Sequence, residues 1–279
     1  MFRRGAKLRP LRASRADPAI RLALTDPLTH TLPGARLVEV SGLRMPEEFS
    51  TMGPETAPTG VLWHGVNIAP ITDDPRTLER FARSLAARPR RASSIVGPTA
   101  DVERMWQHMA PSWAPARELR WHQPLLLADA DPQVTADPAL RPAAPREDEI
   151  VFPASVAMFR EEVGTDPTSH DRGRGYRARV KDLIAHGRTY VLIRDGAVVF
   201  KADVGAIFGD VAQIHGVWVE PELRGHGIAR RAMVAVVEQV RRDHAPQVSL
   251  YVNDYNQAAR RAYAAAGFRP VGELATILF

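Results

Sequence analysis

The chain has 279 residues, the length of roughly two domains of ~150 residues, and is 45% hydrophobic and 25% charged, as ordinary globular proteins are. It contains no cysteine, which excludes a disulfide framework, a thiol nucleophile and a thiolate metal site. No apolar run approaches the ~20 residues of a membrane span, and no signal-peptide core follows Met1. We therefore expect a cytoplasmic protein with no membrane partner.

The formal net charge is +5, a balance that can favour nucleic acid or an anionic ligand. The cations are almost all arginine and are scattered through the whole chain. No long basic run with interleaved aromatic residues is present. We therefore expect no nucleic-acid partner, whereas a phosphate-bearing ligand could use the positive field locally.

The first half predicts a small α/β lobe over residues 1–130. Its first 58 residues give a weak pattern, in which Leu37–Val40 reads as a strand and Arg44–Pro58 as a loop. From Gly60 onward the order strand, helix, strand, helix, strand is clearer. The expected elements are a strand over 61–68 stopped by Pro70, a helix opened by Asp74 and Pro75, a strand over 93–97, a helix over 99–109 and a strand over 124–127.

Residues 130–146 contain four prolines and predict a linker, with a possible first strand of the next domain at 139–142. The second domain is expected over residues 138–279. Hydrophobic periodicity and turn residues define its elements. They are helices over 147–163, 174–186, 228–243 and 257–266, strands over 188–193, 197–207, 213–219, 248–252 and 270–278, a tight turn at Asp195–Gly196 and a loop over 221–227.

A strand, a loop with two glycines and an amphipathic helix follow one another between Val217 and Arg230. Glycine lets the backbone approach a ligand closely, and the start of a helix offers unpaired N–H groups at the positive end of its dipole. Gly225 and Gly227 therefore predict an anion site suited to a diphosphate. A dinucleotide-binding turn would need a third glycine where Arg230 stands, and an ordinary strand-to-helix turn is the other alternative.

A second segment, residues 250–268, lies one strand further along the chain. Asn256 is placed to cap a helix, and Gly267 is placed to end it. Asn256, Ala259 and Tyr263 are spaced by three and four residues and so share one helix face. The two segments therefore put a candidate anion site and a candidate polar helix face in one domain.

Together these segments resemble the GNAT superfamily of acetyl-coenzyme A-dependent N-acetyltransferases, over about residues 138–279. The coenzyme motif Arg/Gln-x-x-Gly-x-Gly/Ala is matched by Arg224, Gly227 and Ala229. The motif Asn-x-x-Ala-x-x-x-Tyr-x-x-x-Gly-Phe is matched by Asn256, Ala259, Tyr263, Gly267 and Phe268. The whole chain is similar to GNAT proteins that have an additional N-terminal domain.

The resemblance implies an α/β (α+β) fold class. It consists of a C-terminal GNAT fold, with a mixed, mostly antiparallel central sheet flanked by helices, and an N-terminal α/β lobe. Because the lobe lacks an Arg-x-x-Gly-x-Gly match, we interpret it as a degenerate GNAT-like copy without coenzyme.

The resemblance also implies direct transfer of an acetyl group from the thioester of acetyl-CoA to an amine, without a metal. The backbone of Val217 and Val219 would align the pantetheine arm, and the Val219 N–H would polarise the thioester carbonyl. Asn256 would contact the arm or brace the loop. The expected coenzyme-binding residues are Val217, Trp218, Val219, Arg224, Gly225, His226, Gly227, Ile228, Ala229, Arg230 and Asn256.

Tyr263 is the candidate general acid for the departing thiolate, because a phenol with a pKa near 10 can donate a proton at neutral pH. The alternative is a core tyrosine on the inward face of the helix. The attacking amine must also lose a proton. Family members often use a strand carboxylate, but Gln213 stands at that position.

His215, two residues further on and so on the same strand face, has a suitable pKa range and is the candidate base. A packed histidine is the alternative reading. Glu161, Glu162 or an ordered water could take the same role.

The remaining histidines, His64, His122, His170 and His226 among them, show no metal-ligand spacing. Trp63, Trp106, Trp113 and Trp121 are expected in the core of the lobe, or lining an acceptor groove. The acceptor itself, a small molecule or a protein amine, is left open, as is a homodimer. A non-catalytic acyl-CoA-binding or regulatory protein is the alternative function.

Overall fold

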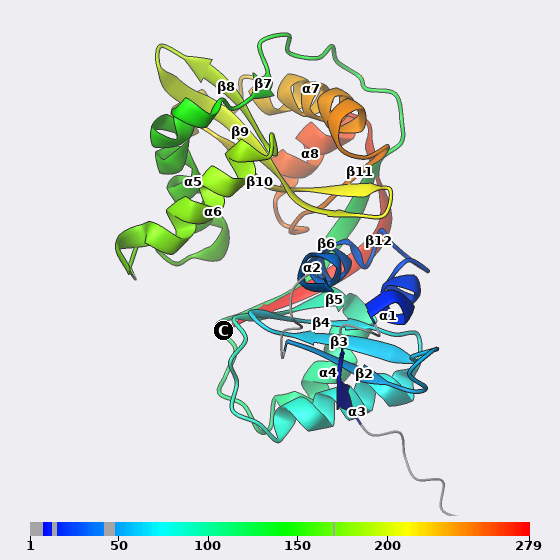
Figure 1. Ribbon diagram of the computed structural model, residues 1–279. Coiled ribbons are helices and arrows are strands. Elements are labelled where there is room, and N and C mark those ends of the chain that lie inside the picture. The colour runs from blue at the N-terminus through cyan, green and yellow to red at the C-terminus, as the bar shows by residue number, and fades with distance from the viewer. Residues whose placement is uncertain (1–7, 13–15, 42–47, 170) are drawn as a thin grey trace, which may run out of the picture. The chain divides into compact units, whose positions relative to one another are not determined.

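The computed structural model describes residues 8–12, 16–41, 48–169 and 171–279 (Figure 1). They form two compact units. Unit 1 comprises the residues up to Leu125, Tyr251–Tyr255 and Pro270–Phe279, and unit 2 comprises Leu126–Leu250 and Asn256–Arg269. The expected domains, 1–130 and 138–279, stay a prediction. The compact units are not continuous in sequence, because the last residues of the chain, Pro270–Phe279, pack in unit 1.

Unit 1 is built on a sheet whose strands β1, β2, β3 and β4 pair in that order and are antiparallel. Strand β5 then pairs parallel to β4 after the crossover helix α3. The elements of the first half of the chain are β1 (Arg9–Pro10), α1 (Ala16–Ala23), α2 (Thr31–Ser41), β2 (Phe49–Met52), β3 (Gly60–His64), β4 (Asn67–Ile71), α3 (Pro75–Ala86), β5 (Ser94–Pro98), α4 (Thr99–Met109) and β6 (Glu118–Ala128).

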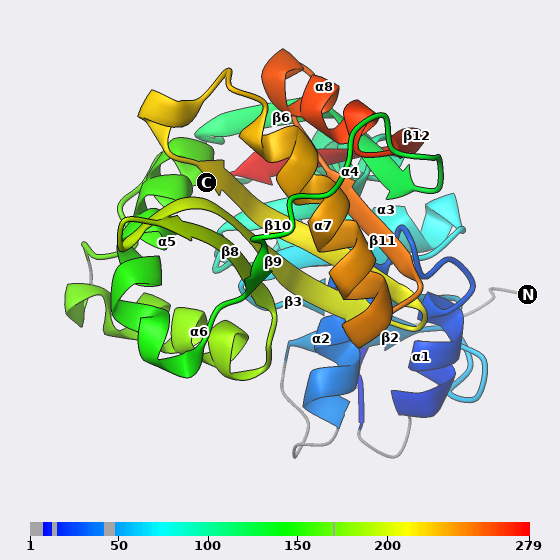
Figure 2. The same cartoon turned by 90° about the horizontal axis from the view of Figure 1, so that it is seen from above.

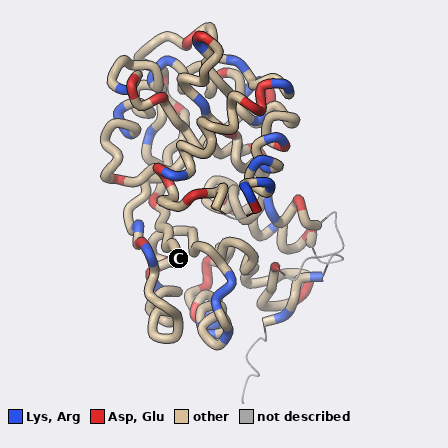
Figure 3. The backbone as a smooth tube through the Cα atoms, turned by 90° about the vertical axis from the view of Figure 1, so that its left-hand side faces the viewer, with Lys and Arg blue, Asp and Glu red and all other residues tan. Residues whose placement is uncertain are grey.

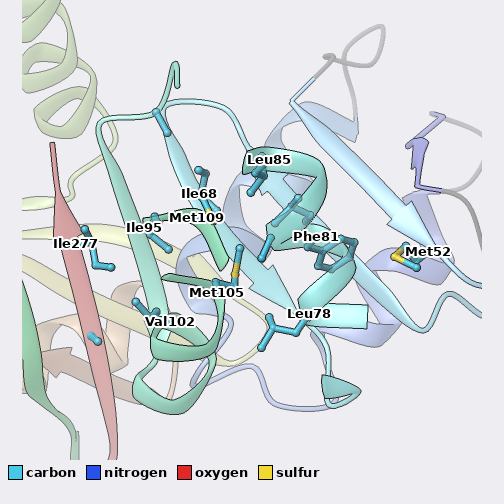
Figure 4. Packing of buried hydrophobic residues seen from close by; sticks show 14 residues of the cluster. Met52, Ile68, Leu78, Phe81, Leu85, Ile95, Val102, Met105, Met109 and Ile277 are labelled. Atoms are coloured by element: carbon cyan, nitrogen blue, oxygen red, sulfur yellow. The ribbon is translucent and has the colours of Figure 1, made fainter. Parts of the chain in front are cut away.

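The core of unit 1 lies between its sheet and the helices α3 and α4 (Figure 4). Phe81 and Met105 are fully buried, one from each helix. Trp63 is buried as expected, and Trp106, Trp113 and Trp121 are partly buried around this core. Its cluster consists of Met52, Leu62, Ile68, Leu78, Phe81, Ala82, Leu85, Ala92, Ile95, Val102, Met105, Met109, Ala275 and Ile277.

Three expectations for the first half are wrong. Leu37–Val40 lies in helix α2, because Gly34, Leu37 and Val40 are buried at helical spacing. The single strand over 61–68 is two antiparallel strands, β3 and β4. Strand β4 runs through Pro70, since its pairing with β5 ends at Ile68 and needs no N–H further on.

The loop expected over 44–58 contains strand β2. The part of that loop before residue 48 lies outside the described residues, as does His170. The strand expected at 139–142 is present as β7, which pairs with β8.

Unit 2 repeats the pairing pattern of unit 1. Strands β7, β8, β9 and β10 pair in order and are antiparallel, and β11 pairs parallel to β10 after helix α7. Figures 1 and 2 show α5 and α6 on one face of this sheet and α7 and α8 on the other. The elements are β7 (Arg141–Pro142), α5 (Asp148–Val163), α6 (Arg174–Ala185), β8 (Thr189–Arg194), β9 (Ala197–Phe208), β10 (Val211–Val219), α7 (Ile228–Asp243), β11 (Gln247–Tyr251), α8 (Gln257–Ala265) and β12 (Phe268–Leu278), with 3₁₀ turns at Pro145–Glu147, Asp171–Gly173 and Pro221–Leu223.

The element order β-α-α-β-β-β-α-β-α-β therefore occurs twice along the chain. The last strand of each copy is exchanged. Strand β12, from the second half, is hydrogen-bonded to β5, and strand β6, from the first half, is hydrogen-bonded to β11. Ala275 and Ile277 of β12 accordingly belong to the core of unit 1. The mixed, mostly antiparallel sheet flanked by helices confirms the expected fold class.

Basic and acidic residues are interspersed along the chain in both units (Figure 3). In the described ranges, no helix combines the length and the hydropathy that a bilayer crossing requires.

Candidate active site

Strands β10 and β11 diverge in the middle of the unit 2 sheet. Their parallel pairing runs from Val211 to Gln213, whereas β10 stays paired with β9 as far as Val219. The edge of β10 that faces away from β9 is therefore open beyond Gln213 in the described part of the chain. An open strand edge presents peptide N–H and C=O groups that an extended ligand can use.

The peptide groups at the end of β10 alternate between the two edges of the strand. The Glu220 N–H donates to the Val199 carbonyl on β9 at 3.0 Å. Because successive peptide groups point to opposite edges, the Val219 N–H faces the open edge. The Val219 carbonyl, on the same side, accepts a hydrogen bond from Arg224 Nε at 3.0 Å.

The turn between β10 and α7 is open. Gly225 and Gly227 have φ of +84° and +77°, and a Cβ built on either would meet nothing within 4 Å. Gly227 is the N-cap of α7, and among the described residues no side chain caps this helix start. The first N–H groups of α7 thus lack an intrahelical partner and lie at the positive end of the helix dipole. This arrangement suits a doubly charged phosphate ligand.

Arg224 braces this turn. Its guanidinium bonds both carboxylate oxygens of Glu161, at 3.0 and 2.8 Å. The same carboxylate accepts from the Trp218 indole N–H at 3.3 Å. Glu161 therefore ties helix α5 to strand β10 and to the turn. Arg230, by contrast, lies exposed in the first turn of α7.

Asn256 and Tyr263 lie on α8, the helix that follows β11. The Asn256 side chain accepts from the Ala259 N–H at 3.1 Å, as expected for an N-cap. Tyr263 is 7% exposed, and its ring packs against Phe268 with 5.9 Å between centroids. Burial, with a smaller effect of the Glu162 charge, raises the pKa of Tyr263 above its usual value, so the phenol stays protonated at neutral pH.

His215 lies in a constrained position on β10. Its Nε2 and the Gln213 Oε1 are 2.8 Å apart, and its ring fills the space beside Gly205, where an added Cβ would collide with the imidazole. Burial and the nearby positive charge of Arg179 lower the pKa of His215 to about 4, although Asp203 opposes the shift. The imidazole is therefore neutral at pH 7 and only weakly basic.

The other candidate bases lie in different surroundings. Glu161 is engaged by Arg224 and Trp218. Burial raises the pKa of Tyr263 and of Tyr176, and the charge of Glu162 adds a smaller effect in the same direction. In the described ranges, no group of three or more His, Cys, Asp or Glu side chains could hold a metal ion.

The equivalent turn of unit 1, between β4 and α3, is closed. The Asp74 carboxylate accepts from the N–H groups of Arg76 and Thr77, at 3.1 and 3.2 Å, and Pro75 removes a further donor. A carboxylate of the protein thus occupies the helix start, where it would repel a phosphate. The Pro70 ring lies 3.5 Å from the position of a Cβ on Gly97 of β5, beyond the β4–β5 pairing that ends at Ile68.

Lys201 and Asp203 were not identified as candidate residues from the sequence. They form a buried ion pair on β9 beside Gly216 of β10. A lysine and an aspartate two residues apart in an apolar strand, with a glycine inside the neighbouring strand, are the signals that could have identified them.

The diverging strands, the uncapped helix start and the glycine turn define unit 2 as a GNAT-type fold. Residues 156–268 match the model of the acetyltransferase (GNAT) family, and residues 48–151 match that of a domain of unknown function, DUF4081. The second half of the chain therefore matches the acetyltransferase (GNAT) family, and the match to the uncharacterised domain precedes it.

Solved structures share this fold over the length of the chain. A protein from Drosophila aligns with a TM-score of 0.67 at 13% identity, over 99% of both chains. A GCN5-related N-acetyltransferase from Sphaerobacter thermophilus aligns with a TM-score of 0.61 at 15% identity, over 99% of this chain and 96% of that one. A tandem GNAT protein from the clavulanic acid biosynthesis pathway aligns with a TM-score of 0.55 at 17% identity, over 97% and 98%.

Among curated proteins, the mycothiol acetyltransferase of Brachybacterium faecium is 39% identical over 92 residues. The match covers 33% of this chain and 27% of that protein. The chain therefore spans about a quarter of the length of this curated relative.

Proposed function

We propose that the protein is an acetyl-CoA-dependent N-acetyltransferase that moves the acetyl group directly from the thioester to an amine. The carrying observation is the open turn of Gly225 and Gly227, which leads from the free edge of β10 into the uncapped start of α7. The match of residues 156–268 to the GNAT family model and the partial match to a curated acetyltransferase support the same reaction class.

In this proposal the free edge of β10 takes up the pantetheine arm as an added strand. Val217 and Val219 supply the peptide groups, and the Val219 N–H donates to the thioester oxygen, where negative charge develops. The amides from Gly225 to Arg230 hold the diphosphate. Arg224 acts mainly by bracing the turn, because Glu161 and the Val219 carbonyl engage its guanidinium.

The amine nitrogen forms a bond to the acetyl carbon, and the bond from that carbon to sulfur breaks. Tyr263, which burial keeps protonated at neutral pH, gives its proton to the departing thiolate. The raised pKa of Tyr263 also makes the phenol a weaker acid. The amine proton passes to a base. His215 stays the predicted base: its ring is neutral and can accept a proton, but its lowered pKa makes it a weak base. Glu162 and a water molecule are the other candidates.

Unit 1 takes no coenzyme in this proposal, because Asp74 occupies the helix start that corresponds to α7. The acceptor is a small amine or a protein amine. The protein acts in the cytoplasm, without a metal.

The test has two arms. Calorimetric titration with acetyl-CoA measures binding, and release of free thiol is monitored while small amines, amino acids and peptide amines are supplied as acceptors. Binding together with amine-dependent thiol release supports the proposal. Binding without release under any acceptor would favour the acyl-CoA-sensing alternative, and absence of binding at millimolar acetyl-CoA would overturn both.

A further inference from the structure

A lysine without exposed surface lies on the central strand β9 of unit 2. Lys201 is 0% exposed, and its Nζ is 2.6 Å from Asp203 Oδ2. The other oxygen of Asp203 accepts a hydrogen bond from Thr189 Oγ1 at 2.9 Å. A buried ammonium lowers stability unless it is paired and hydrogen-bonded. An apolar side chain would fill the same space at a lower cost, so the burial of this ion pair points to a role of the charge itself.

The ammonium has a second contact, on the neighbouring strand. Lys201 Nζ donates to the Gly216 carbonyl of β10 at 3.3 Å. Gly216 lies at a register shift, since His215 pairs with Asp203 but Trp218 pairs with Lys201. Strand β10 therefore has one more residue than β9 between these pairs, which is a β-bulge.

The bulge conformation is specific to glycine. Gly216 has φ of +55°, and a Cβ there would lie 2.8 Å from the Met158 Cε and 3.3 Å from Asp203 Oδ2. Met158 from α5 thus covers the bulge on one side, and the ammonium of Lys201 holds its carbonyl.

The bulge decides which peptide groups reach the open edge. Along a strand, every second N–H faces the same neighbouring strand. The extra residue of the bulge shifts this alternation by one residue, so a different set of N–H groups faces β9 after the bulge than would without it. After the bulge, Glu220 donates to β9, and the Val219 N–H faces the edge left free by β11. Loss of the bulge would turn this N–H away from that edge.

We propose that Lys201 is a positioning residue for acetyl transfer: held by Asp203, it fixes the Gly216 bulge and so aims the Val219 N–H at the thioester carbonyl. This inference rests on the proposed function, because the role given to Lys201 is to orient the Val219 N–H toward the thioester carbonyl. Lys201 touches no reacting atom in this scheme and acts through the backbone of β10.

The test compares three variants of the full chain. Lys201→Met removes the ammonium but leaves the Asp203 carboxylate buried and unpaired, which can itself unfold the protein. The double variant Lys201→Met with Asp203→Asn removes both charges and avoids that effect. Lys181→Met is the matched control, because Lys181 makes an exposed ion pair with Asp148 on the surface of unit 2.

Four quantities are measured: the melting temperature, the affinity for acetyl-CoA, the split between kcat and KM, and hydrogen exchange in the segment 214–219. We expect the double variant to melt close to the wild type and to bind acetyl-CoA within about threefold of it. Because misplacement by about 1 Å costs ~10²-fold in rate, its kcat should fall by that order while exchange in the segment rises. Lys181→Met should match the wild type in all four.

A folded double variant with wild-type kcat and wild-type exchange would overturn the proposal. If the wild type itself releases no thiol with any amine, the proposed function fails instead. The exchange of the 214–219 segment then still decides whether Lys201 holds the bulge.

Discussion

The sharpest test of the proposed coenzyme site is a carboxylate introduced at Gly225 in its turn. In Gly225→Asp the new side chain has room, since a Cβ there meets nothing within 4 Å. Two effects are expected: backbone strain from an L residue at φ +84°, and repulsion of the diphosphate. A matched control separates them. Gly196, in the β8–β9 turn, has φ of +76° and equal space around its Cβ.

The size of the repulsion follows from Coulomb's law. Two like unit charges about 5 Å apart repel by about 0.8 kcal/mol in water and by about 3 kcal/mol at an effective dielectric constant of 20. These energies correspond to about 4-fold and about 200-fold weaker binding. Strain of about 1–2 kcal/mol per residue is common to both variants and acts on stability.

Calorimetric titration with acetyl-CoA and thermal denaturation form the assay. We expect similar melting temperatures for Gly225→Asp and Gly196→Asp, and weakened binding in the first alone. The weakening should diminish at high salt, which screens the repulsion. Equal affinity of the two variants at low salt would refute the assignment of this turn to the diphosphate.

Three further predictions concern single side chains. Tyr263→Phe should lower kcat by ~10²-fold or more with unchanged acetyl-CoA affinity, and an unchanged rate in stopped-assay kinetics would remove its role as acid. Gly216→Ala should lower the free energy of unfolding by about 1–3 kcal/mol from backbone strain alone, and by more because of the clash with Met158. Adding Met158→Ala to this variant should relieve the clash but not the strain, as measured by denaturant titration. Burial, with the Asp73 charge, raises the pKa of Asp101 to about 6, so its protonated form stabilises the fold fully below pH about 4, and this contribution is lost as the pH rises through about 6. Asp101→Asn should therefore raise the melting temperature at pH 7.5 but not at pH 3.5, and an equal shift at both would contradict the burial argument.

Local signals predicted the parts of the fold that depend on neighbouring residues. Asp74 and Pro75 marked the start of α3, and the bounds expected for α7, 228–243, are those observed. These elements carry their own caps, turns or periodic apolar faces, so short-range patterns suffice. The run Leu37–Val40 misled because four residues do not separate a strand from one face of a helix.

The exchange of β6 and β12 lay beyond any such pattern. Both strands read correctly as extended, but their neighbours, β11 and β5, are chosen by long-range pairing. The candidate site divides in the same way. The turn at Gly225 and Gly227 follows from the sequence, whereas the lowered pKa of His215 depends on burial beside Gly205, which lies on another strand.

The exchanged strands also limit which fragments of the chain can fold on their own. A fragment limited to residues 156–268, the span that matches the GNAT model, would lack β6 and leave β11 with a bare row of amides and carbonyls. A fragment that ends before Phe268 would lack β12 and expose β5 in the same manner. Bare strand edges recruit other chains, so we expect each fragment, produced alone, to precipitate or associate.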